Sequence, residues 1–327
     1  MPRTSPHTLI SPPVLLAPLA GITDLPFRSL VSRFGAGRVV SEMIASGEFL
    51  TDRPGTREKA ELGAGIDITS VQLAGRTPEA MAEAARMVEG MGAQVIDINM
   101  GCPAKKVVGG YSGSALLRDL DHACRLIDAV VSAVSVPVTL KTRLGWDDAS
   151  HNAAELAQRA ERIGIAMLVI HGRTRCQFYK GQANWRAIRE IKDAVSIPVI
   201  ANGDIVDTRT ARQALDQSGA DGVMIGRGAQ GRPWLLAQIA AEIFGTPAPD
   251  VPVGADLVDT VQGHYDAMLS FYGTDLGNRV ARKQLGWYMD VAETDTGLRR
   301  AILTAKDPRF VFGALPDALL SDRKVAA

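Results

Sequence analysis

Short apolar, β-branched segments alternate with longer segments of helical periodicity over the first 245 residues. Because helical segments separate successive strands, the strands are expected to run parallel in one sheet. Eight regular pairs without a break favour a closed (β/α)8 TIM barrel over a doubly wound open sheet. The eight expected strands are Val14–Pro18, Arg38–Glu42, Ile68–Leu73, Val95–Asn99, Val138–Arg143, Met167–His171, Val199–Asn202 and Gly222–Ile225.

The segments between the strands carry helix signals of their own. Thr77–Met91 opens with a threonine in the N-cap position and a proline at the first helical position, a common helix start. Asp121–Val134, Asn152–Ile163 and Thr208–Gln217 have apolar residues at helical spacing. We expect these helices to cover the outside of the barrel.

The composition changes after residue 245. Thr246–Pro252 contains three prolines, which is typical of a linker. Beyond it, Leu257–Tyr272, Asn278–Val291 and Gly297–Lys306 have apolar residues at helical spacing. We therefore expect a barrel domain at 1–245 and a small, all-α helical domain at 246–327.

Composition also limits the class of protein. No apolar run approaches the roughly 18 residues that a membrane span needs, and the first residues lack the apolar core of a secretory signal. The three cysteines, Cys102, Cys124 and Cys176, have neither metal-type spacing nor an even number. These features predict a cytoplasmic protein without a metal site. The formal net charge is zero, so a nucleic-acid partner would need a local basic patch.

Polar and small residues lie at the end of every expected strand or just after it. In a barrel, the carboxyl ends of the strands form the catalytic face. A single polar residue at such a position most often has a structural role, with its hydrogen bonds made within the protein. A set that covers all the strand ends indicates a functional site. The set is Pro18, Glu42, Gln72, Asn99, Cys102, Lys141, Arg143, His171, Asn202, Gly203, Asp204, Gly226 and Arg227.

Cys102 occupies the most distinctive of these strand ends. A lone cysteine is more often a small buried hydrophobe. Here it lies between a glycine and a proline, three residues after Asn99 and just before Lys105 and Lys106. An amide on one side and two ammonium groups on the other favour a chemical role for the thiol.

The last two strand ends predict a phosphate site. Loops after the seventh and eighth strands of a barrel often bind phosphate through backbone N–H groups, and Asn202–Asp204 and Gly226–Gly228 supply small residues and a cation. Gly226–Gly231 also matches the pattern G-x-G-x-x-G. A dinucleotide fingerprint would follow the first strand of a βαβ unit and precede an acidic residue by about 20 positions, so we reject that interpretation.

Motifs over nearly the whole chain resemble those of the tRNA-dihydrouridine synthases, and most closely those of the bacterial B-type branch. Asn-x-Gly-Cys-Pro and His-Gly-Arg-Thr are specific in combination, whereas Leu19 stands where methionine is common. The matching segments are Ala17–Asp24, Val71–Leu73, Asp97–Pro103, Thr139–Arg143, His171–Thr174, Ala201–Asp204 and Met224–Arg227.

The resemblance implies an FMN flavoprotein oxidoreductase that uses NADPH, or NADH, to reduce the 5,6 double bond of a specific uridine in tRNA. It implies that Cys102 donates the proton and that Asn99 and Arg143 orient the base or the flavin. Residues 1–245 would then be the FMN-binding domain and residues 246–327 the tRNA-binding domain of a monomer. The implied FMN ligands are Pro18, Leu19, Ala20, Gln72, Lys141, His171, Asn202, Gly203, Asp204, Gly226 and Arg227.

The chemistry of uracil agrees with these implied roles. Uracil is an α,β-unsaturated carbonyl, so hydride addition at C6 produces an enolate that takes a proton at C5. An unperturbed thiol, with a pKa of about 8.5, is a neutral acid at pH 7. Lys141 and His171 can place donors near N1 and O2 of the flavin, where reduction builds negative charge. The uridine must be turned out of the RNA to reach the flavin and the thiol.

The basic residues of the helical domain have two interpretations. By charge pattern alone, these residues are equally consistent with a solvated helix face and with an RNA-binding surface. The resemblance favours contact with the tRNA backbone. The residues expected to make this contact are Arg279, Arg282 and Lys283, together with Lys105 and Lys106.

Three other functions remain open on the residues alone. A flavin barrel for a free small molecule, such as a dihydroorotate or dihydropyrimidine dehydrogenase, would share the barrel and the thiol but would not need a basic helical domain. An aldolase would use Lys141 to form a Schiff base and would lack a flavin spectrum. A non-catalytic RNA-binding protein would bind tRNA and leave its uridine unreduced.

Overall fold

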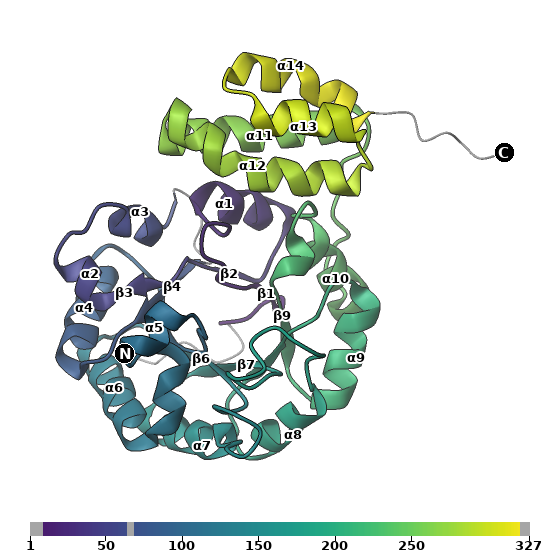
Figure 1. The fold of residues 1–327 in the computed structure, drawn as a ribbon. Coiled ribbons are helices and arrows are strands. Elements are labelled where there is room, and N and C mark those ends of the chain that lie inside the picture. The colour runs from purple at the N-terminus through teal and green to yellow at the C-terminus, as the bar shows by residue number, and fades with distance from the viewer. Residues whose placement is uncertain (1–8, 64–68, 321–327) are drawn as a thin grey trace.

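Parallel strands close into a barrel in the computed structural model of the chain, which describes residues 9–63 and 69–320. The strands are β1 (Val14–Leu16), β2 (Arg38–Val40), β3 (Ile44–Ala45), β4 (Thr69–Ala74), β5 (Val95–Met100), β6 (Val138–Arg143), β7 (Met167–His171), β8 (Val199–Asn202) and β9 (Gly222–Ile225). They pair in the order β2-β1-β9-β8-β7-β6-β5-β4-β3, and β2 also pairs with β4. That last pairing closes eight of the strands into the ring of Figure 1.

The predicted (β/α)8 barrel is therefore confirmed. Each predicted strand is found with its ends shifted by at most two residues, a usual uncertainty for element boundaries. Ile68, the predicted start of the third strand, lies outside the described residues.

One short strand, β3, was not predicted. Val40 pairs with Ser70 and Ile44 pairs with Leu73, so the chain between β2 and β3 holds one residue more than the facing part of β4. An extra residue on one strand is a bulge, which redirects nearby side chains. Glu42 lies in this bulge, buried, and its Oε1 accepts a hydrogen bond from the Gly21 N–H at 2.5 Å.

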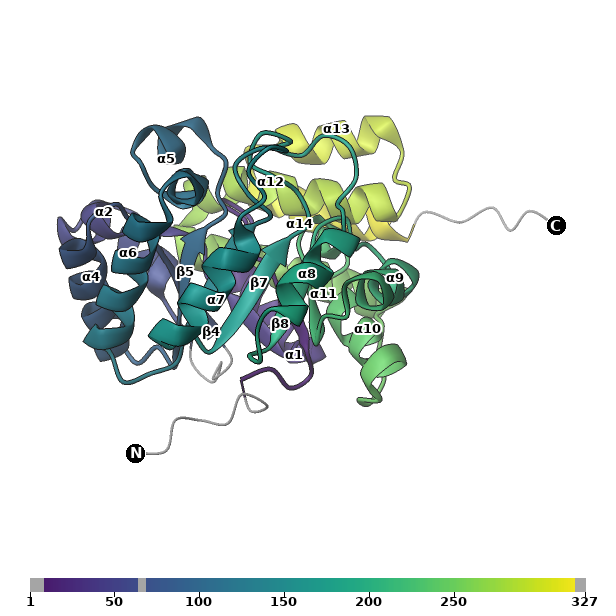
Figure 2. The same cartoon turned by 90° about the horizontal axis from the view of Figure 1, so that it is seen from below.

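Helices surround the barrel, as Figures 1 and 2 show. Their starts follow from local chemistry: the Asp207 carboxylate accepts a hydrogen bond from the Thr210 N–H, and the Thr210 hydroxyl accepts one from the Asp207 N–H, which caps α9. The helices of the barrel are α1 (Leu25–Phe34), α2 (Ser46–Leu50), α3 (Thr56–Ala60), α4 (Pro78–Gly90), α5 (Lys105–Gly109), α6 (Leu120–Ala133), α7 (Ala153–Ile163), α8 (Arg186–Asp193), α9 (Thr208–Ser218) and α10 (Leu235–Phe244), with short 3-10 helices η2 (Gly113–Arg118) and η3 (Arg227–Ala229).

Alternate strand residues fill two separate apolar layers. One set packs against the helices, and the other, which includes Leu15, Val40, Val169, Ile200 and Met224, packs as a separate cluster that contains no helix residues. This alternation follows from the two-residue period of a strand. The inside of the barrel is thus a packed core rather than a pore, which leaves no room for a ligand within it.

Four further helices form the helical domain beside α1 and α10 (Figure 1). They are α11 (Ala255–Tyr272), α12 (Thr274–Val291), α13 (Thr296–Thr304) and α14 (Pro308–Leu319), and they enclose a core of their own. The sequence pattern predicts the first three and misses α14. This helix contains two prolines, Pro308 and Pro316, and Pro308 occupies the first helical turn, where no N–H is needed. No helix in the described ranges has both the length and the hydropathy needed to span a membrane.

The helical domain holds two loops at the carboxyl end of the barrel. The Tyr272 hydroxyl donates to Asp24 Oδ2 at 3.0 Å, and Gln284 Nε2 donates to the Ile22 carbonyl at 3.0 Å. A Cβ on Gly231 would lie 2.5 Å from the Trp287 carbonyl oxygen, so only glycine permits this approach. The loops after β1 and β9 are therefore fixed by contacts from α11 and α12.

His264 of α11 lies in the seam between the two domains and predicts a pH effect on stability. The side chain is 2% exposed, with Nδ1 3.0 Å from the Tyr288 hydroxyl oxygen. Burial lowers its pKa to about 3, whereas an unfolded histidine has a pKa of about 6.5. The unfolded chain alone therefore takes up the proton as pH falls, so this group contributes stability above pH 6.5 that is lost progressively toward pH 3.

The ring of His264 lies 5.7 Å from that of Phe27 on α1. We expect His264→Phe to remove the pH effect while it keeps a ring at this position. Between pH 7 and pH 5 the unfolding free energy of the wild-type protein should fall relative to that of the variant by about 2 kcal/mol. Denaturant unfolding of both proteins at the two pH values measures this difference. Other titrating groups, such as Asp24, whose pKa is raised to about 6 by burial, are present in both proteins and cancel. A difference in unfolding free energy between the two proteins that stays constant with pH would contradict the prediction.

Candidate active site

A cavity of about 920 Å³ opens at the carboxyl ends of the strands. It collects side chains from loops spread over more than half the chain. The predicted site residues that line it are Pro18, Leu19, Ala20, Gln72, Asn99, Cys102, Lys141, Arg143, His171, Asn202, Gly203, Asp204, Gly226 and Arg227. All the residues expected to contact the flavin thus lie around a single cavity.

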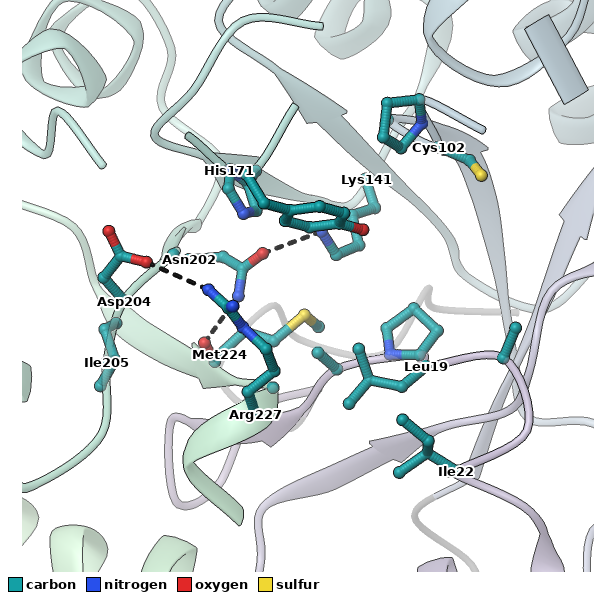
Figure 3. A pocket seen from close by; sticks show the side chains of 18 of the residues that line it. Leu19, Ile22, Cys102, Lys141, His171, Asn202, Asp204, Ile205, Met224 and Arg227 are labelled. Carbon is teal, nitrogen blue, oxygen red and sulfur yellow. Dashed lines mark hydrogen bonds and ion pairs between the residues drawn. The ribbon is translucent and has the colours of Figure 1, made fainter. Parts of the chain in front are cut away.

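Lys141 and Asn202 form the polar centre of the cavity (Figure 3). Lys141 Nζ donates to Asn202 Oδ1 at 3.0 Å, and Asn202 Nδ2 donates to the Met224 carbonyl at 2.8 Å. The chain of contacts crosses from β6 through β8 to β9 and orients both side chains. Desolvation, together with the neighbouring charge of Arg143, lowers the pKa of Lys141 to about 8.

His171 presents a neutral imidazole to the same cavity. Burial, followed by the charges of Lys141 and Arg143, holds its pKa well below the usual value. Its Nδ1 is buried and has no hydrogen-bond partner among the described residues. A Cβ on Gly203, where φ is 113°, would lie 3.3 Å from His171 Cε1 and 2.9 Å from Ala183 Cβ, so the chain needs glycine there. His171 therefore presents a neutral ring, rather than a second charge, to a ligand in the cavity.

Asp204 is largely occupied by protein groups. Arg173, which is 2% exposed, donates to both carboxylate oxygens at 2.9 and 2.5 Å, and the Ala183 N–H donates to Oδ2 at 2.8 Å. Partial burial raises the pKa of Asp204, but these bonds outweigh it and the pKa lies below its usual value. Arg227, 60% exposed, makes only a longer 3.5 Å ion pair with this carboxylate. The guanidinium of Arg227 is therefore the one accessible to an anion.

Arg173 was not predicted as a site residue, although it belongs to the His-Gly-Arg-Thr motif. Its side chain also donates to the Lys180 carbonyl at 3.1 Å and to the Gly181 carbonyl at 2.6 Å. It thus connects β7, the loop that follows, and Asp204 after β8. The motif was the available signal, but which carboxylate Arg173 would meet depended on the fold.

Cys102 lies at the end of the cavity away from Asp204 and Arg227 (Figure 3). Asn99 Oδ1 accepts from the Gly101 N–H at 3.1 Å and from the Cys102 N–H at 2.9 Å. Ser114 donates from its N–H at 3.1 Å and from its hydroxyl at 2.8 Å to the Cys102 carbonyl. The residue is only half-buried, so the thiol is held at the cavity by its backbone rather than packed in the core.

A buried network orients the amides behind Cys102. Asn99 Nδ2 donates to Gln72 Oε1 at 2.8 Å, and Gln72 Nε2 donates to Asp97 Oδ2 at 2.6 Å. Thr139 donates to the other oxygen of Asp97 at 2.6 Å, and burial raises the pKa of this carboxyl. Gln72 and Asn99 therefore have defined orientations before any ligand binds.

Arg143 donates hydrogen bonds to three backbone carbonyls. Nε donates to the Gly101 carbonyl at 2.8 Å, and Nη1 donates to the carbonyls of Thr174 and Phe178 at 3.0 and 2.9 Å. Its Cζ also lies 5.6 Å from the centre of the Tyr179 ring, as does Cζ of Arg227. Tyr179, an exposed aromatic residue that no sequence motif indicated, thus lies beside two cations at the mouth of the cavity.

The remaining predicted residues lie outside the cavity lining. Lys105 and Lys106, both exposed, begin α5, and Lys106 faces Glu48 at 3.6 Å. On α12, Arg279 and Lys283 are exposed and Arg282 is half-buried. Lys283 Nζ would lie 3.4 Å from a Cβ on Gly21, which places this one ammonium beside the loop after β1.

These features define an enzyme of the (β/α)8-barrel class. Oriented amides, a buried cation, a neutral imidazole and a half-buried thiol converge at the catalytic end of the barrel. Within residues 9–63 and 69–320, no group of three or more His, Cys, Asp or Glu side chains could hold a metal ion.

The comparisons with known proteins assign the family. A family model described as dihydrouridine synthase matches residues 15–319. The chain is 62% identical to a "Probable tRNA-dihydrouridine synthase" of Rhodobacter capsulatus over 97% of each chain. It is 52% identical to a protein of the same description from Rhizobium leguminosarum bv. phaseoli, over 94% of this chain and 95% of that one. It is 47% identical to "tRNA-dihydrouridine synthase B" of Xanthomonas campestris, over 94% of this chain and 92% of that one.

The chain therefore belongs to the dihydrouridine synthase family, whose members are flavin-dependent oxidoreductases. The resemblance seen in the motifs is confirmed.

Two solved structures share the fold at low sequence identity. A complex of 2-naphthoyl-CoA reductase with 2-naphthoyl-CoA has a TM-score of 0.56 and 13% identity, covering 73% of this chain and 51% of that chain. The histamine dehydrogenase of Rhizobium sp. 4-9 has a TM-score of 0.55 and 12% identity, covering 96% of this chain and 63% of that chain. At this level of identity, the likeness concerns the fold alone.

Proposed function

We propose that the protein reduces the 5,6 double bond of a specific uridine in tRNA to 5,6-dihydrouridine, with bound FMN and with NADPH or NADH as the reductant. Family membership and the descriptions of the relatives support this activity. The observation that carries the proposal is a single cavity with the Cys102 thiol at one end and the Arg227 guanidinium at the other. A flat cofactor and a pyrimidine can occupy the space between them.

The residues of the cavity fit FMN. The flavin phosphate needs a cation and close backbone approach, which Arg227 and Gly203 offer at one end. The ring needs an apolar wall, supplied by the loop after β1, and donors for its polar edge, supplied by Lys141 and His171. The Arg227 guanidinium is 60% exposed and makes only a 3.5 Å ion pair among the described residues, so it can bind the phosphate. When bound, FMN supplies the hydride, which it has received from the nicotinamide.

Lys141 and His171 act on the charge that the reaction develops. With a pKa of about 8, Lys141 is mostly an ammonium at neutral pH, so it stabilises negative charge at the polar edge of the bound ring. His171 is neutral and contributes a hydrogen bond without adding a second full charge. Asn202 holds the ammonium in position through the 3.0 Å contact.

Cys102 supplies the proton. Its S–H bond breaks as the proton moves to C5 of the uracil ring, and the thiolate that remains is reprotonated from solvent. Asn99 restrains the backbone on which the thiol is carried. The base must leave its stack to reach this position, which costs a few kcal/mol.

In this proposal the barrel is the catalytic domain and residues 246–327 bind tRNA, with one copy of the chain acting in the cytoplasm. Arg279 and Lys283 are exposed on α12, and Lys283 lies beside the loop after β1. Arg282 would have to turn outward to contact RNA. The polar contacts from Tyr272 and Gln284 to the barrel loops support a domain that orients a large substrate, which a dehydrogenase of free pyrimidines would not need.

The purified protein should be yellow and should release FMN on denaturation. With NADPH or NADH it should convert uridine to dihydrouridine in tRNA taken from a strain that lacks the protein. Sequencing that tRNA identifies the position that has lost dihydrouridine. Turnover of free uridine or dihydroorotate in place of tRNA would favour the small-molecule dehydrogenase, and a colourless protein that takes up no flavin would refute the proposal.

A further inference from the structure

Two arginines stack on one tryptophan at the rim of the barrel. Cζ of Arg118, at the end of η2, lies 5.0 Å from the centre of the Trp146 ring, and Cζ of Arg175 lies 4.7 Å from it. Stacking holds a guanidinium against an aromatic ring and leaves the N–H groups at its edge available to an anion. We call these three residues the arginine–tryptophan cluster.

Backbone contacts between three loops build this cluster. The Arg175 N–H donates to the Gly145 carbonyl at 3.0 Å, and the Cys176 N–H donates to the Trp146 carbonyl at 2.9 Å, so the loops after β6 and β7 run side by side. Asn152 Nδ2 donates to the Leu117 carbonyl at 2.7 Å, which ties the end of η2 to the loop after β6. The three side chains are therefore brought together without a ligand.

The two positive charges of the cluster are not neutralised within the part of the chain that the structure describes. Neither Arg118 nor Arg175 makes an ion pair or a side-chain hydrogen bond there, and the buried Nε of Arg175 has no acceptor. The carboxylates of Asp119 and Asp147 accept hydrogen bonds from their own segments, and Asp148 is exposed. Two unpaired guanidiniums on one ring repel each other, so an anion close to both would be stabilised.

The cluster lies across the cavity from the helical domain. In the ring of strands, β6 is directly opposite β1. Trp146 follows β6, whereas α11 and α12 hold the loop after β1. Figure 1 shows the same arrangement, with α7 and α8 on the side of the barrel away from α11–α14. The η2 helix that ends at Arg118 is also bonded to Cys102 through Ser114, which places the cluster near the catalytic end of the cavity.

We propose that the arginine–tryptophan cluster binds backbone phosphates of the tRNA on the side of the cavity opposite the helical domain. The inference rests on the proposed function and adds a second contact surface to it. An RNA segment whose uridine enters the cavity has backbone on both sides of that nucleotide, so contacts on two opposite rims hold it better than contacts on one. Planar guanidiniums suit this role because they bind phosphate oxygens in pairs.

The test is the variant Arg118→Gln/Arg175→Gln in the FMN-loaded protein. Its Kd for tRNA should rise roughly 10-fold or more at physiological salt, and the slope of log Kd against log salt should decrease by about one to two. The matched control is Arg86→Gln/Arg162→Gln, which removes the same charge from exposed positions on α4 and α7. The control should bind tRNA as the wild-type protein does.

Several outcomes distinguish this inference from others. Equal tRNA affinity of the two double variants would overturn it, and a raised KM for NADPH with unchanged tRNA affinity would instead assign the cluster to a dinucleotide phosphate. If the glutamine variant unfolds, Arg118→Lys/Arg175→Lys keeps the charges and should retain the salt slope, whereas a lost slope would contradict charge recognition. A wild-type protein that neither binds tRNA nor reduces its uridine would refute the proposed function itself.

Discussion

Cys102→Ala should lower the rate of dihydrouridine formation by about 10² to 10⁴-fold, the usual contribution of a positioned acid, while FMN stays bound. The substitution removes the proton donor but leaves the backbone contacts that Asn99 and Ser114 make with this residue. The half of the reaction between NADPH and the flavin should be unaffected, because it requires no proton from the thiol.

Rapid-mixing experiments separate the two halves of this reaction. Loss of flavin absorbance after addition of NADPH measures the first half, and its return after addition of tRNA measures the second. Cys176→Ala is the control, since this exposed thiol lies outside the cavity lining, and it should retain near-normal rates. Full turnover by Cys102→Ala on tRNA would exclude the thiol from the mechanism.

Arg173→Met should lower the unfolding free energy of the flavin-free protein by about 3 kcal/mol or more, because it leaves the partly buried Asp204 carboxylate with only the longer ion pair to Arg227 and one backbone N–H. The guanidinium of Arg173 is 2% exposed and binds both oxygens of Asp204. Its loss also leaves the carbonyls of Lys180 and Gly181 without their donor. The loop after β7 should then become more mobile, which hydrogen exchange can detect.

Arg227→Gln is the matched comparison, since Arg227 pairs with the same carboxylate but is 60% exposed. An exposed pair of this kind contributes at most about 1 kcal/mol, so the stability of the flavin-free protein should hardly change. The Kd for FMN should instead rise about 10-fold or more, since a charged hydrogen bond to the phosphate is lost. Equal destabilisation by the two substitutions, or an unchanged Kd for FMN in Arg227→Gln, would contradict these separate roles.

Much of the barrel could be predicted because its information is local. Each strand is a short β-branched segment, each helix has a 3.6-residue period, and parallel strands direct their carboxyl ends to one face. The residues after the strands could therefore be assigned to one site without knowledge of any contact. The motif around Cys102 and the His-Gly-Arg-Thr motif then pointed to the family that the comparisons establish.

Other features depended on contacts between distant loops. The bulge that carries Glu42 exists only relative to the pairing of β4, and α14 contains prolines that local rules count against a helix. That Arg143 orients the base or the flavin stays a prediction, but the backbone carbonyls after β5 and β7 that accept from its Nε and Nη1 could not be predicted. No local sequence pattern predicts which distant carbonyls such a side chain will bond.

The amino-acid sequence by itself determined the alternation of strands and helices, the rim on which the polar residues gather and the position of the thiol on that rim. Only the tertiary structure decided that Arg173 holds Asp204, that α12 contacts the loop after β1, and that Arg118 and Arg175 share Trp146. The reason is physical: periodicity and turn chemistry act over a few residues, whereas ion pairs and stacking depend on distances between side chains that only the closed barrel sets.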